Sequence, residues 1–360
     1  MLMHLILRMK DSHTKNFICE DILINILARL PAKSLVRFMC VCKSWSNLIG
    51  SSSFITTHLN RNIKNHDHLF LISHHYYRGG RSLISLSSNE TFEQCLELQH
   101  PSWTKERCRV YGSSNGLVCI SDQKLSSTSS ICIWNPSIRK SISLPKTCIP
   151  DHSRLFSRSY LSFCFHPNHN DYKVVKMLHE RKKRSMEVEV YSLSTNSWKM
   201  IEITPWFNST WNFIGHEVCN GIVYWLIFED YYRIVSFDTR SEKFDELVVP
   251  DPIPPVKGDV IIQLYKETIC LLQGHKDVDL WVLQEGSFQR LRTIFLPEAN
   301  NFRLIGLFTD NGLLVKEQSR FTDLKLQLFD LESNQLKSTG ILMCDRKRHT
   351  YIESLVLLDH

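Results

Sequence analysis

A single sequence unit recurs along this chain from residue 61 to its end and constrains the fold more than any other feature. Each copy has an apolar strand that ends in an aromatic residue or leucine, then a polar turn, then a second strand. The equivalent positions, separated by roughly 44–57 residues, are Leu86, Trp134, Tyr191, Phe237, Trp281 and Phe329. This period is typical of propeller blades. We therefore predict a β-propeller of six blades over residues 66–360, with an open two-layer sandwich as the alternative.

Three of the copies are preceded by an Asn-Gly pair, at Asn115-Gly116, Asn220-Gly221 and Asn311-Gly312. Asn-Gly supplies the positive φ angles that tight hairpin turns need. We therefore expect a further strand before each copy and four strands in each blade. The last apolar segment, Tyr351–Leu358, has no partner downstream, and we predict that it closes the ring by pairing with the first blade near Leu69–Ser73.

Residues 17–60 depart from this pattern because their apolar residues recur at helical spacing. Ile22, Ile26 and Leu30 stand at i, i+4 and i+8 and define one wide apolar face. Pro31 should end this first helix, because the residue before a proline is pushed out of the helical region. Two further helices are expected after it, then a short fourth helix capped by Ser52 or Ser53.

The predicted helical segment is too small to stand alone. About forty residues bury too little surface for a stable independent fold. We therefore expect the segment to dock on a partner helix or on the next domain of its own chain. The first ten residues, MLMHLILRMK, are apolar but too short to span a membrane. Residues 1–16 are expected to form a flexible extension.

The helical segment resembles the F-box of plant proteins. The match is the motif ILARLP-x-KSLVRF-x-x-V-CKSW-x-x-LI between Ile26 and Ile49. Cys19 departs from the family, which usually has proline at the start of the first helix. The resemblance implies binding to a Skp-type adaptor and, through it, to a cullin-based ubiquitin ligase; the alternative is a helical cap that packs only on its own chain. The residues that it assigns to the adaptor contact are Leu27, Leu30, Pro31, Leu35, Val36, Val41, Cys42 and Trp45.

The repeat region resembles the F-box-associated, kelch-like domain of plant F-box proteins. The residues that carry this resemblance are NGLVCI at 115–120, IWNPS at 133–137, FHP at 165–167 and DYKV at 171–174. Stretches such as KSLVRFMCVCKSWSNLIGSSSF and TYIESLVLL make the chain similar to the S-locus F-box proteins, which act in pollen during self-incompatibility. That similarity implies a secreted style ribonuclease as the target.

A basic ribonuclease would be repelled at long range by a chain of net charge +6. We therefore predict that target binding uses local acidic loops, with two further loops adding discrimination. The candidates, expected in turns of the fourth and fifth repeats and in the loops 300–303 and 344–350, are Glu229, Asp230, Asp245, Glu246, Asp251, Asp277, Asp279, Asn301, Arg303 and Arg346.

Composition excludes several other classes of protein. Lys and Arg number 43 against 37 Asp and Glu, far from the charge density of a dedicated nucleic-acid binder. The 12 cysteines are scattered singly without a Cys-x-x-Cys pair, which indicates buried thiols in a reducing compartment rather than disulfides or a zinc site. His66 and His68 share a strand face that could bind a metal, but we favour an exposed edge there. We predict no metal, cofactor, nucleic acid or membrane partner, and a cytoplasmic location that can extend to the nucleus.

No motif of a common enzyme class is present. The chain has no Gly-rich phosphate loop, no His-Glu-x-x-His and no Gly-x-Ser-x-Gly. We predict a non-catalytic receptor, which accelerates ubiquitin transfer by holding a target near the conjugating enzyme. A propeller-type enzyme with a site in its channel and a non-degradative binding scaffold remain as alternatives.

Overall fold

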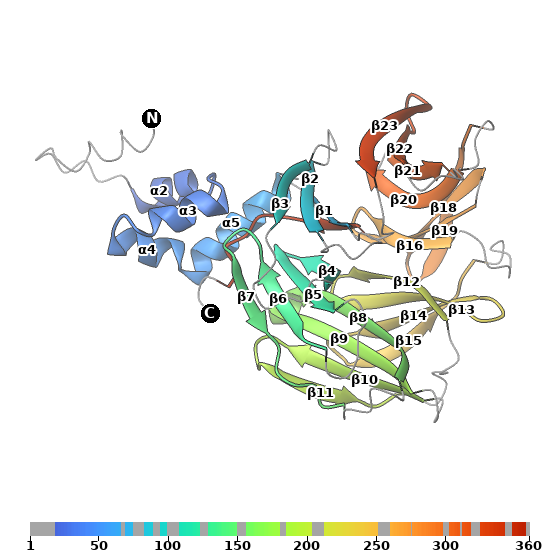
Figure 1. The fold of residues 1–360 in the computed structure, drawn as a ribbon, viewed down its shortest axis with the longest axis horizontal. Helices are drawn as coiled ribbons and strands as arrows, with labels where there is room; N and C mark the ends of the chain where they lie inside the picture. Colours follow the sequence, from blue (N-terminus) through green and yellow to red (C-terminus); the bar gives the residue numbers. More distant parts are fainter. Residues whose placement is uncertain are drawn as a thin grey trace, which may run out of the picture.

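In the part of the chain that the structure describes, the α-helices come before the strands (Figure 1). The computed structural model describes residues 19–65, 69–74, 83–88, 94–98, 108–122, 129–149, 156–180, 185–203, 212–250, 260–274, 276–297, 302–309, 312–317, 325–342 and 348–357. The helices are α2 (Glu20–Leu27), α3 (Ala32–Phe38), α4 (Lys43–Ile49) and α5 (Ser52–Lys64). The predicted order, a small helical domain followed by an all-β propeller, is confirmed.

The predicted cap of the last helix is wrong by one residue. Ser51 has an extended backbone, and its hydroxyl accepts a hydrogen bond from the Phe54 N–H at 3.2 Å. Neither Ser52 nor Ser53 can do this, because both already have helical geometry inside α5. The helix then continues for 13 residues and is the longest of the four, not a short one.

The described strands form six four-stranded antiparallel sheets. Sheets 1 and 2 contain β24 (Arg348–Tyr351), β1 (Leu69–His74), β2 (Leu83–Ser88) and β3 (Gln94–Leu98), then β4 (Cys108–Ser114), β5 (Leu117–Asp122), β6 (Ile131–Asn135) and β7 (Lys140–Ser143). Sheets 3 and 4 contain β8 (Phe156–His166), β9 (Asp171–Glu180), β10 (Ser185–Ser192) and β11 (Ser197–Ile201), then β12 (Asn212–Cys219), β13 (Ile222–Phe228), β14 (Tyr232–Asp238) and β15 (Lys243–Leu247). Sheets 5 and 6 contain β16 (Val260–Tyr265), β17 (Thr268–Gln273), β18 (Asp277–Gln284) and β19 (Ser287–Phe295), then β20 (Phe302–Thr309), β21 (Gly312–Glu317), β22 (Lys325–Asp330) and β23 (Gln335–Leu342). A 3-10 turn, η1 (Pro167–His169), joins β8 to β9.

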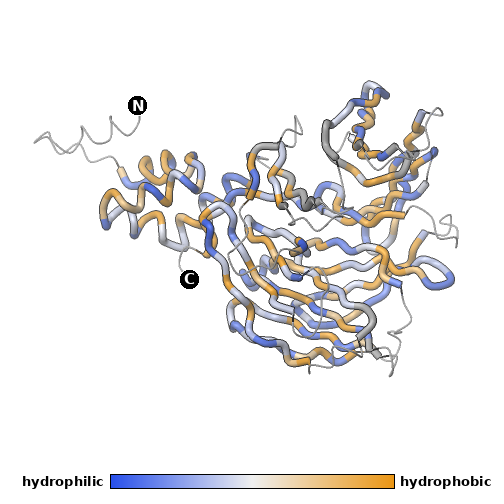
Figure 2. The backbone as a smooth tube through the Cα atoms, viewed as in Figure 1, coloured by the Kyte–Doolittle hydropathy of each residue, from blue (hydrophilic) through white to orange (hydrophobic). Residues whose placement is uncertain are grey.

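The sequence repeat corresponds to one strand of each sheet. Its six equivalent positions all fall in the third strand, namely β2, β6, β10, β14, β18 and β22. Neighbouring sheets pack through shared apolar clusters, as where Trp134 of sheet 2 lies with Leu71 and Leu86 of sheet 1. Figure 2 shows that hydrophobic residues follow the strands while the turns are more hydrophilic.

The turns between strands also follow the predicted chemistry. Asn115 and Gly116 have φ angles of 49° and 78°, and Asn220 and Gly221 have 50° and 77°. Both pairs join the first strand of a sheet to the second, as predicted from the Asn-Gly dipeptides.

The closing strand lies upstream of its predicted position. Strand β24, Arg348–Tyr351, pairs antiparallel with β1, so the C-terminal region does complete the first sheet. Of the predicted strand Tyr351–Leu358, only Tyr351 belongs to β24. Residues 352–357 leave the sheet because their side chains and backbone engage the helices and sheet 2 instead.

Candidate functional site

The predicted adaptor-binding residues divide by burial. Leu27 and Leu35 are completely buried in a core that the helices share with Leu355. They can therefore support a binding surface from within but cannot contact a partner themselves. Pro31 and Val41 are exposed, and the partly buried remainder are Leu30, Val36, Cys42 and Trp45.

The exposed apolar side chains on the helices define the surface available to a partner. Ile22 on α2 is 55% exposed and Val41, between α3 and α4, is 42% exposed. Trp45 packs edge-on against Phe38, with ring centroids 5.6 Å apart, and so holds α4 against α3. Sequence reasoning placed Ile22 on the apolar face of its helix but not in the site. We add Ile22 to the candidate adaptor-binding surface because its side chain is exposed and no described segment covers it.

A buried histidine lies beneath this surface. The ring of His58 on α5 is fully buried, and its Nε2 lies 3.0 Å from the carbonyl oxygen of Leu30. Because a carbonyl only accepts, this bond requires the neutral Nε2–H tautomer, or a charged ring, as the donor. Burial lowers the pKa of His58, and the Leu30 bond and the nearby Glu353 carboxylate only partly offset this; Arg61 lowers it further.

We expect the helical domain to lose stability on mild acidification. The unfolded chain protonates His58 at a pKa near 6.5, whereas the folded chain resists protonation until a lower pH. The stabilisation is therefore complete above pH 6.5 and declines as the pH falls from 6.5 toward the folded pKa, by at most about 1.4 kcal/mol per pH unit. Hydrogen exchange of α2 and α3 between pH 7.5 and 5.5, corrected for intrinsic rates, measures it. His58→Gln, which keeps a donor for Leu30, should flatten the dependence, and an equally steep decline in that variant would contradict this assignment.

Some of the predicted target-binding residues that the structure describes lie at the edge of the propeller opposite the helices. In an antiparallel sheet, successive turns alternate between the two ends of the strands. The first and third turns of sheet 2 face the helical domain, because Gly116 and Asn135 both contact the chain between β24 and the C-terminus. Second turns, and the connections between sheets, therefore lie at the far end. The β13–β14 turn with Glu229 and Asp230 is one of these, and it projects away from the helices in Figure 1.

Several of these residues do not lie in turns as predicted. Asp245 and Glu246 belong to β15, and Asp277 and Asp279 to β18. In β18, Asp277 and Asp279 alternate with the buried Val278 and Leu280, so they can belong to a strand. In β15, Asp245 and Glu246 are adjacent and both exposed. Arg303 lies in β20, and only its backbone is described, while Asp251, Asn301 and Arg346 lie outside the described residues.

Two of the acidic side chains already have cationic partners. Glu246 Oε1 lies 2.9 Å from Arg233 Nη1, and Asp279 Oδ2 lies 3.6 Å from Arg290 Nη1. Asp230 is exposed, and beside it Tyr231 is an exposed aromatic residue with the Arg233 guanidinium 4.4 Å from its ring centroid. Tyr231 was missed from sequence, because an aromatic residue flanking a strand is usually read as core. The turn thus presents negative charge next to an accessible ring.

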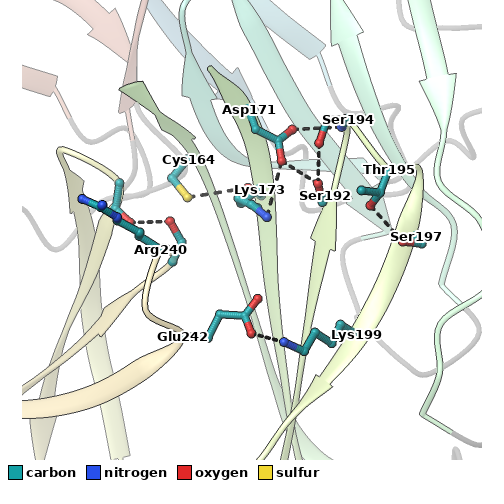
Figure 3. A network of polar contacts seen from close by, with 12 residues as sticks. Cys164, Asp171, Lys173, Ser192, Ser194, Thr195, Ser197, Lys199, Arg240 and Glu242 are labelled. Atoms are coloured by element: carbon teal, nitrogen blue, oxygen red, sulfur yellow. Dashed lines mark hydrogen bonds and ion pairs between the residues drawn. The ribbon is translucent and has the colours of Figure 1, made fainter. Parts of the chain in front are cut away.

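A polar network at the helix-side ends of sheets 3 and 4 has a structural role (Figure 3). The Asp171 carboxylate accepts hydrogen bonds from the Ser192 hydroxyl at 2.5 Å and the Ser194 N–H at 2.9 Å. Burial alone would raise the pKa of Asp171, but these bonds outweigh it and leave the pKa below its ordinary value. Lys199 and Glu242 form an ion pair between the two sheets. An ionised carboxylate that is committed to a turn in this way fastens the turn and does not suit acid–base chemistry.

Metal and thiol chemistry has no assembled centre among the described residues. No group of three or more His, Cys, Asp or Glu side chains in that part of the chain is placed to hold a metal ion. The ten cysteines whose side chains are described are free thiols, and five of them are buried. Burial raises the pKa of Cys108 to about 11 and that of Cys132 to about 12, so these thiols stay protonated. His66 and His68, the pair considered for a metal, lie outside the described residues. None of the described helices has the length and apolar composition needed to cross a membrane.

Comparisons with known proteins identify the class to which this architecture belongs. The F-box domain family matches residues 18–57, and the family described as F-box associated beta propeller domain matches residues 68–360. The chain therefore belongs to the plant F-box proteins that carry an F-box-associated β-propeller domain.

Similar proteins come from Arabidopsis thaliana. F-box protein CPR1 is 28% identical over 374 residues, which cover 94% of this chain and 88% of that protein. F-box protein At2g21930 is 30% identical over 299 residues, which cover 74% of this chain and 69% of that protein. Among solved structures, TolB from Acinetobacter baumannii matches 76% of this chain and 68% of its own with 11% identity and a TM-score of 0.38, which is too low to support any inference.

Proposed function

We propose that this protein is the target-recognition subunit of a Skp–cullin–F-box ubiquitin ligase. The observation that carries the proposal is the order of its two parts, an F-box at residues 18–57 followed by a propeller at residues 68–360. The helical surface around Ile22 and Val41 binds the Skp-type adaptor, which links the chain to the cullin. Pro31 and the partly buried Leu30, Val36, Cys42 and Trp45 complete this surface, while Leu27 and Leu35 support it from the core.

The proposed mechanism is positional and needs no catalytic residue in this chain. A target held by the propeller has its lysines at a high effective concentration near the conjugating enzyme. The ligase so formed would act in the cytoplasm or nucleus. Formation of a complex between the full chain and a Skp-type adaptor tests the proposal. A chain that binds targets but no adaptor would instead be a plain scaffold or a propeller enzyme.

The far edge of the propeller is the proposed target site. Its support is the acidic β13–β14 turn, which is hydrophilic in Figure 2 and lies on a rigid sheet. A basic protein fits this edge electrostatically, and the similarity to S-locus proteins favours a style S-ribonuclease as that protein. Because the chain as a whole has a net charge of +6, a basic protein would be attracted by this acidic turn only at short range.

Charge reversal at this turn should slow target binding. Glu229→Lys with Asp230→Lys is expected to lower the association rate constant of a basic ribonuclease by roughly tenfold at low salt and to flatten its salt dependence, because charges at a rim act mainly on encounter. The matched control is Glu267→Lys with Glu285→Lys, which makes the same charge change in turns at the helix-side end. Surface plasmon resonance over a salt series measures both. Equal on-rates for the two variants would exclude this turn, and no binding by the wild type would exclude the ribonuclease.

A further inference from the structure

The segment after β24 inserts side chains into two different cores. Leu355 is completely buried among the helices, where it lies with Leu27 and Leu35. Leu357, two residues on, is 1% exposed and belongs to the core between sheets 2 and 3. We call residues 352–357 the bridging segment. Val356 of this segment packs against both cores as well, as does Ile138 of the β6–β7 turn, and both side chains are partly buried.

On its helical side, the bridging segment takes over the capping of α3. Pro31 occupies the N-cap position of α3 and offers no side-chain acceptor. The Glu353 carboxylate accepts a hydrogen bond from the Ala32 N–H at 3.2 Å, and the Glu353 carbonyl accepts one from Asn62 Nδ2 at 3.0 Å. A residue 321 positions away in sequence thus satisfies an N–H group that the helix cannot satisfy itself.

On its propeller side, the segment is held by Asn135 at the end of β6. Asn135 Nδ2 donates to the carbonyl oxygens of Ser354 at 3.0 Å and Val356 at 2.8 Å, while its Oδ1 accepts from the Ser137 N–H at 2.9 Å. Asn135 is itself completely buried. The backbones also approach closely, because a Cβ at Gly116 would lie 2.6 Å from the Ile352 carbonyl oxygen.

The same position in two other sheets is an aspartate. Asp238 ends β14 and Asp330 ends β22, and each accepts backbone N–H groups of its own turn as Asn135 does. An aspartate fulfils the turn function, but it has no N–H to donate. The asparagine occurs in the sheet that contacts the bridging segment. Its N–H group binds that segment, which is a role that the turn itself does not require.

We propose that the bridging segment is a structural part of the F-box and that Asn135 is the positioning residue that locks it to the propeller. The helical domain then depends on the far end of the chain for its core and for the cap of α3. The two ends of the receptor move as one body, so a target on the propeller is held at a fixed position relative to the adaptor. This last consequence rests on the proposed function, whereas the coupling itself does not.

The isosteric variant Asn135→Asp tests the lock. It keeps the acceptor for Ser137 but places a carboxylate against two carbonyl oxygens, which leaves buried acceptors without a donor. In hydrogen exchange of the full chain without any partner, amides of α2, α3 and the bridging segment should exchange roughly 10- to 100-fold faster. Strands β12–β15, on sheet 4, should be unchanged. The control is the reverse substitution, Asp330→Asn, at the equivalent turn of sheet 6. It should leave the exchange rates of the helical amides as in the wild type.

Three outcomes would overturn the inference. Unchanged exchange in the helices of Asn135→Asp would show that the F-box folds without the lock. An equal effect of Asp330→Asn would show that the helices merely report general destabilisation. If Asn135→Asp fails to fold, Leu355→Ala removes only the helical anchor and is expected to speed exchange in α2 and α3 and not in β12–β15. Uniform acceleration over all sheets in that variant would contradict the coupling.

Failure of the wild type to bind an adaptor would instead count against the proposed function and leave the exchange result standing.

Discussion

Replacement of Val41 by glutamate should weaken adaptor binding by roughly 100-fold or more, because the partner would have to bury an unpaired charge. Val41 is 42% exposed and is not part of the helical core, so the substitution should leave the fold intact. Ile22→Glu, at a side chain that is 55% exposed on α2, should behave in the same way. Isothermal titration of the full chain with a Skp-type adaptor measures the dissociation constant.

The control for this prediction is a matched substitution on the propeller. Leu291 on β19 is 50% exposed, so Leu291→Glu adds the same charge at a similar exposure far from the helices. Its adaptor affinity should equal that of the wild type.

The pair Leu30→Ala with Pro31→Ala should also weaken binding by tenfold or more, since burying a large aliphatic chain is worth about 1.5–3 kcal/mol. Leu30 packs against the helical core, however, so Val41 gives the cleaner result. Wild-type affinity in Val41→Glu and Ile22→Glu would place the adaptor elsewhere.

Replacement of Lys176 by methionine should destabilise the propeller by about 3–5 kcal/mol, because it leaves an uncompensated buried charge. Lys176 on β9 and Glu189 on β10 are both completely buried, with Nζ and Oε1 3.2 Å apart. Burial lowers the pKa of Lys176, and the Glu189 carboxylate opposes this. Glu189 Oε2 also accepts from the Cys148 N–H at 2.8 Å, which fastens the connection from sheet 2 to sheet 3.

The double variant separates the ion pair from the packing. Lys176→Met with Glu189→Gln removes both charges and keeps an acceptor for Cys148. We expect its free energy of unfolding to lie within about 1–2 kcal/mol of the wild type, because neutral replacement of a whole buried pair is often tolerated. Urea unfolding followed by tryptophan fluorescence compares the variants. A double variant as unstable as Lys176→Met would mean that the aliphatic stem of the lysine, and not its charge, matters.

Local patterns predicted the elements of this protein well. The apolar repeat identified the third strand of each of the six sheets, and Asn-Gly pairs identified the first turns of sheets 2 and 4. The third pair includes Asn311, which lies outside the described residues. The helices also followed from periodicity, but the first ends at Leu27, three residues before the predicted end at Leu30-Pro31. These features depend on residues close in sequence, so a single sequence can reveal them.

Features that depend on distant partners were not predictable. The segment after Tyr351 reads as a strand, yet Leu355 and Glu353 leave the sheet because the helices offer them a core and an unsatisfied N–H. No local pattern marks Lys176 and Glu189 as an ion pair. They meet only because β9 and β10 are the middle strands of sheet 3, where both side chains are completely buried. The sequence could not show whether Leu27 and Leu35 are buried in the core or contact a partner, because both roles require an apolar side chain.

The most direct test of the receptor function is the mass of the species formed when the full chain is mixed with a Skp-type adaptor. Size-exclusion chromatography with light scattering gives this mass. We expect a complex of one chain with one adaptor in the wild type, and separate elution when the chain carries Val41→Glu and Ile22→Glu. A wild-type chain that is folded but elutes apart from the adaptor at micromolar concentration would contradict it.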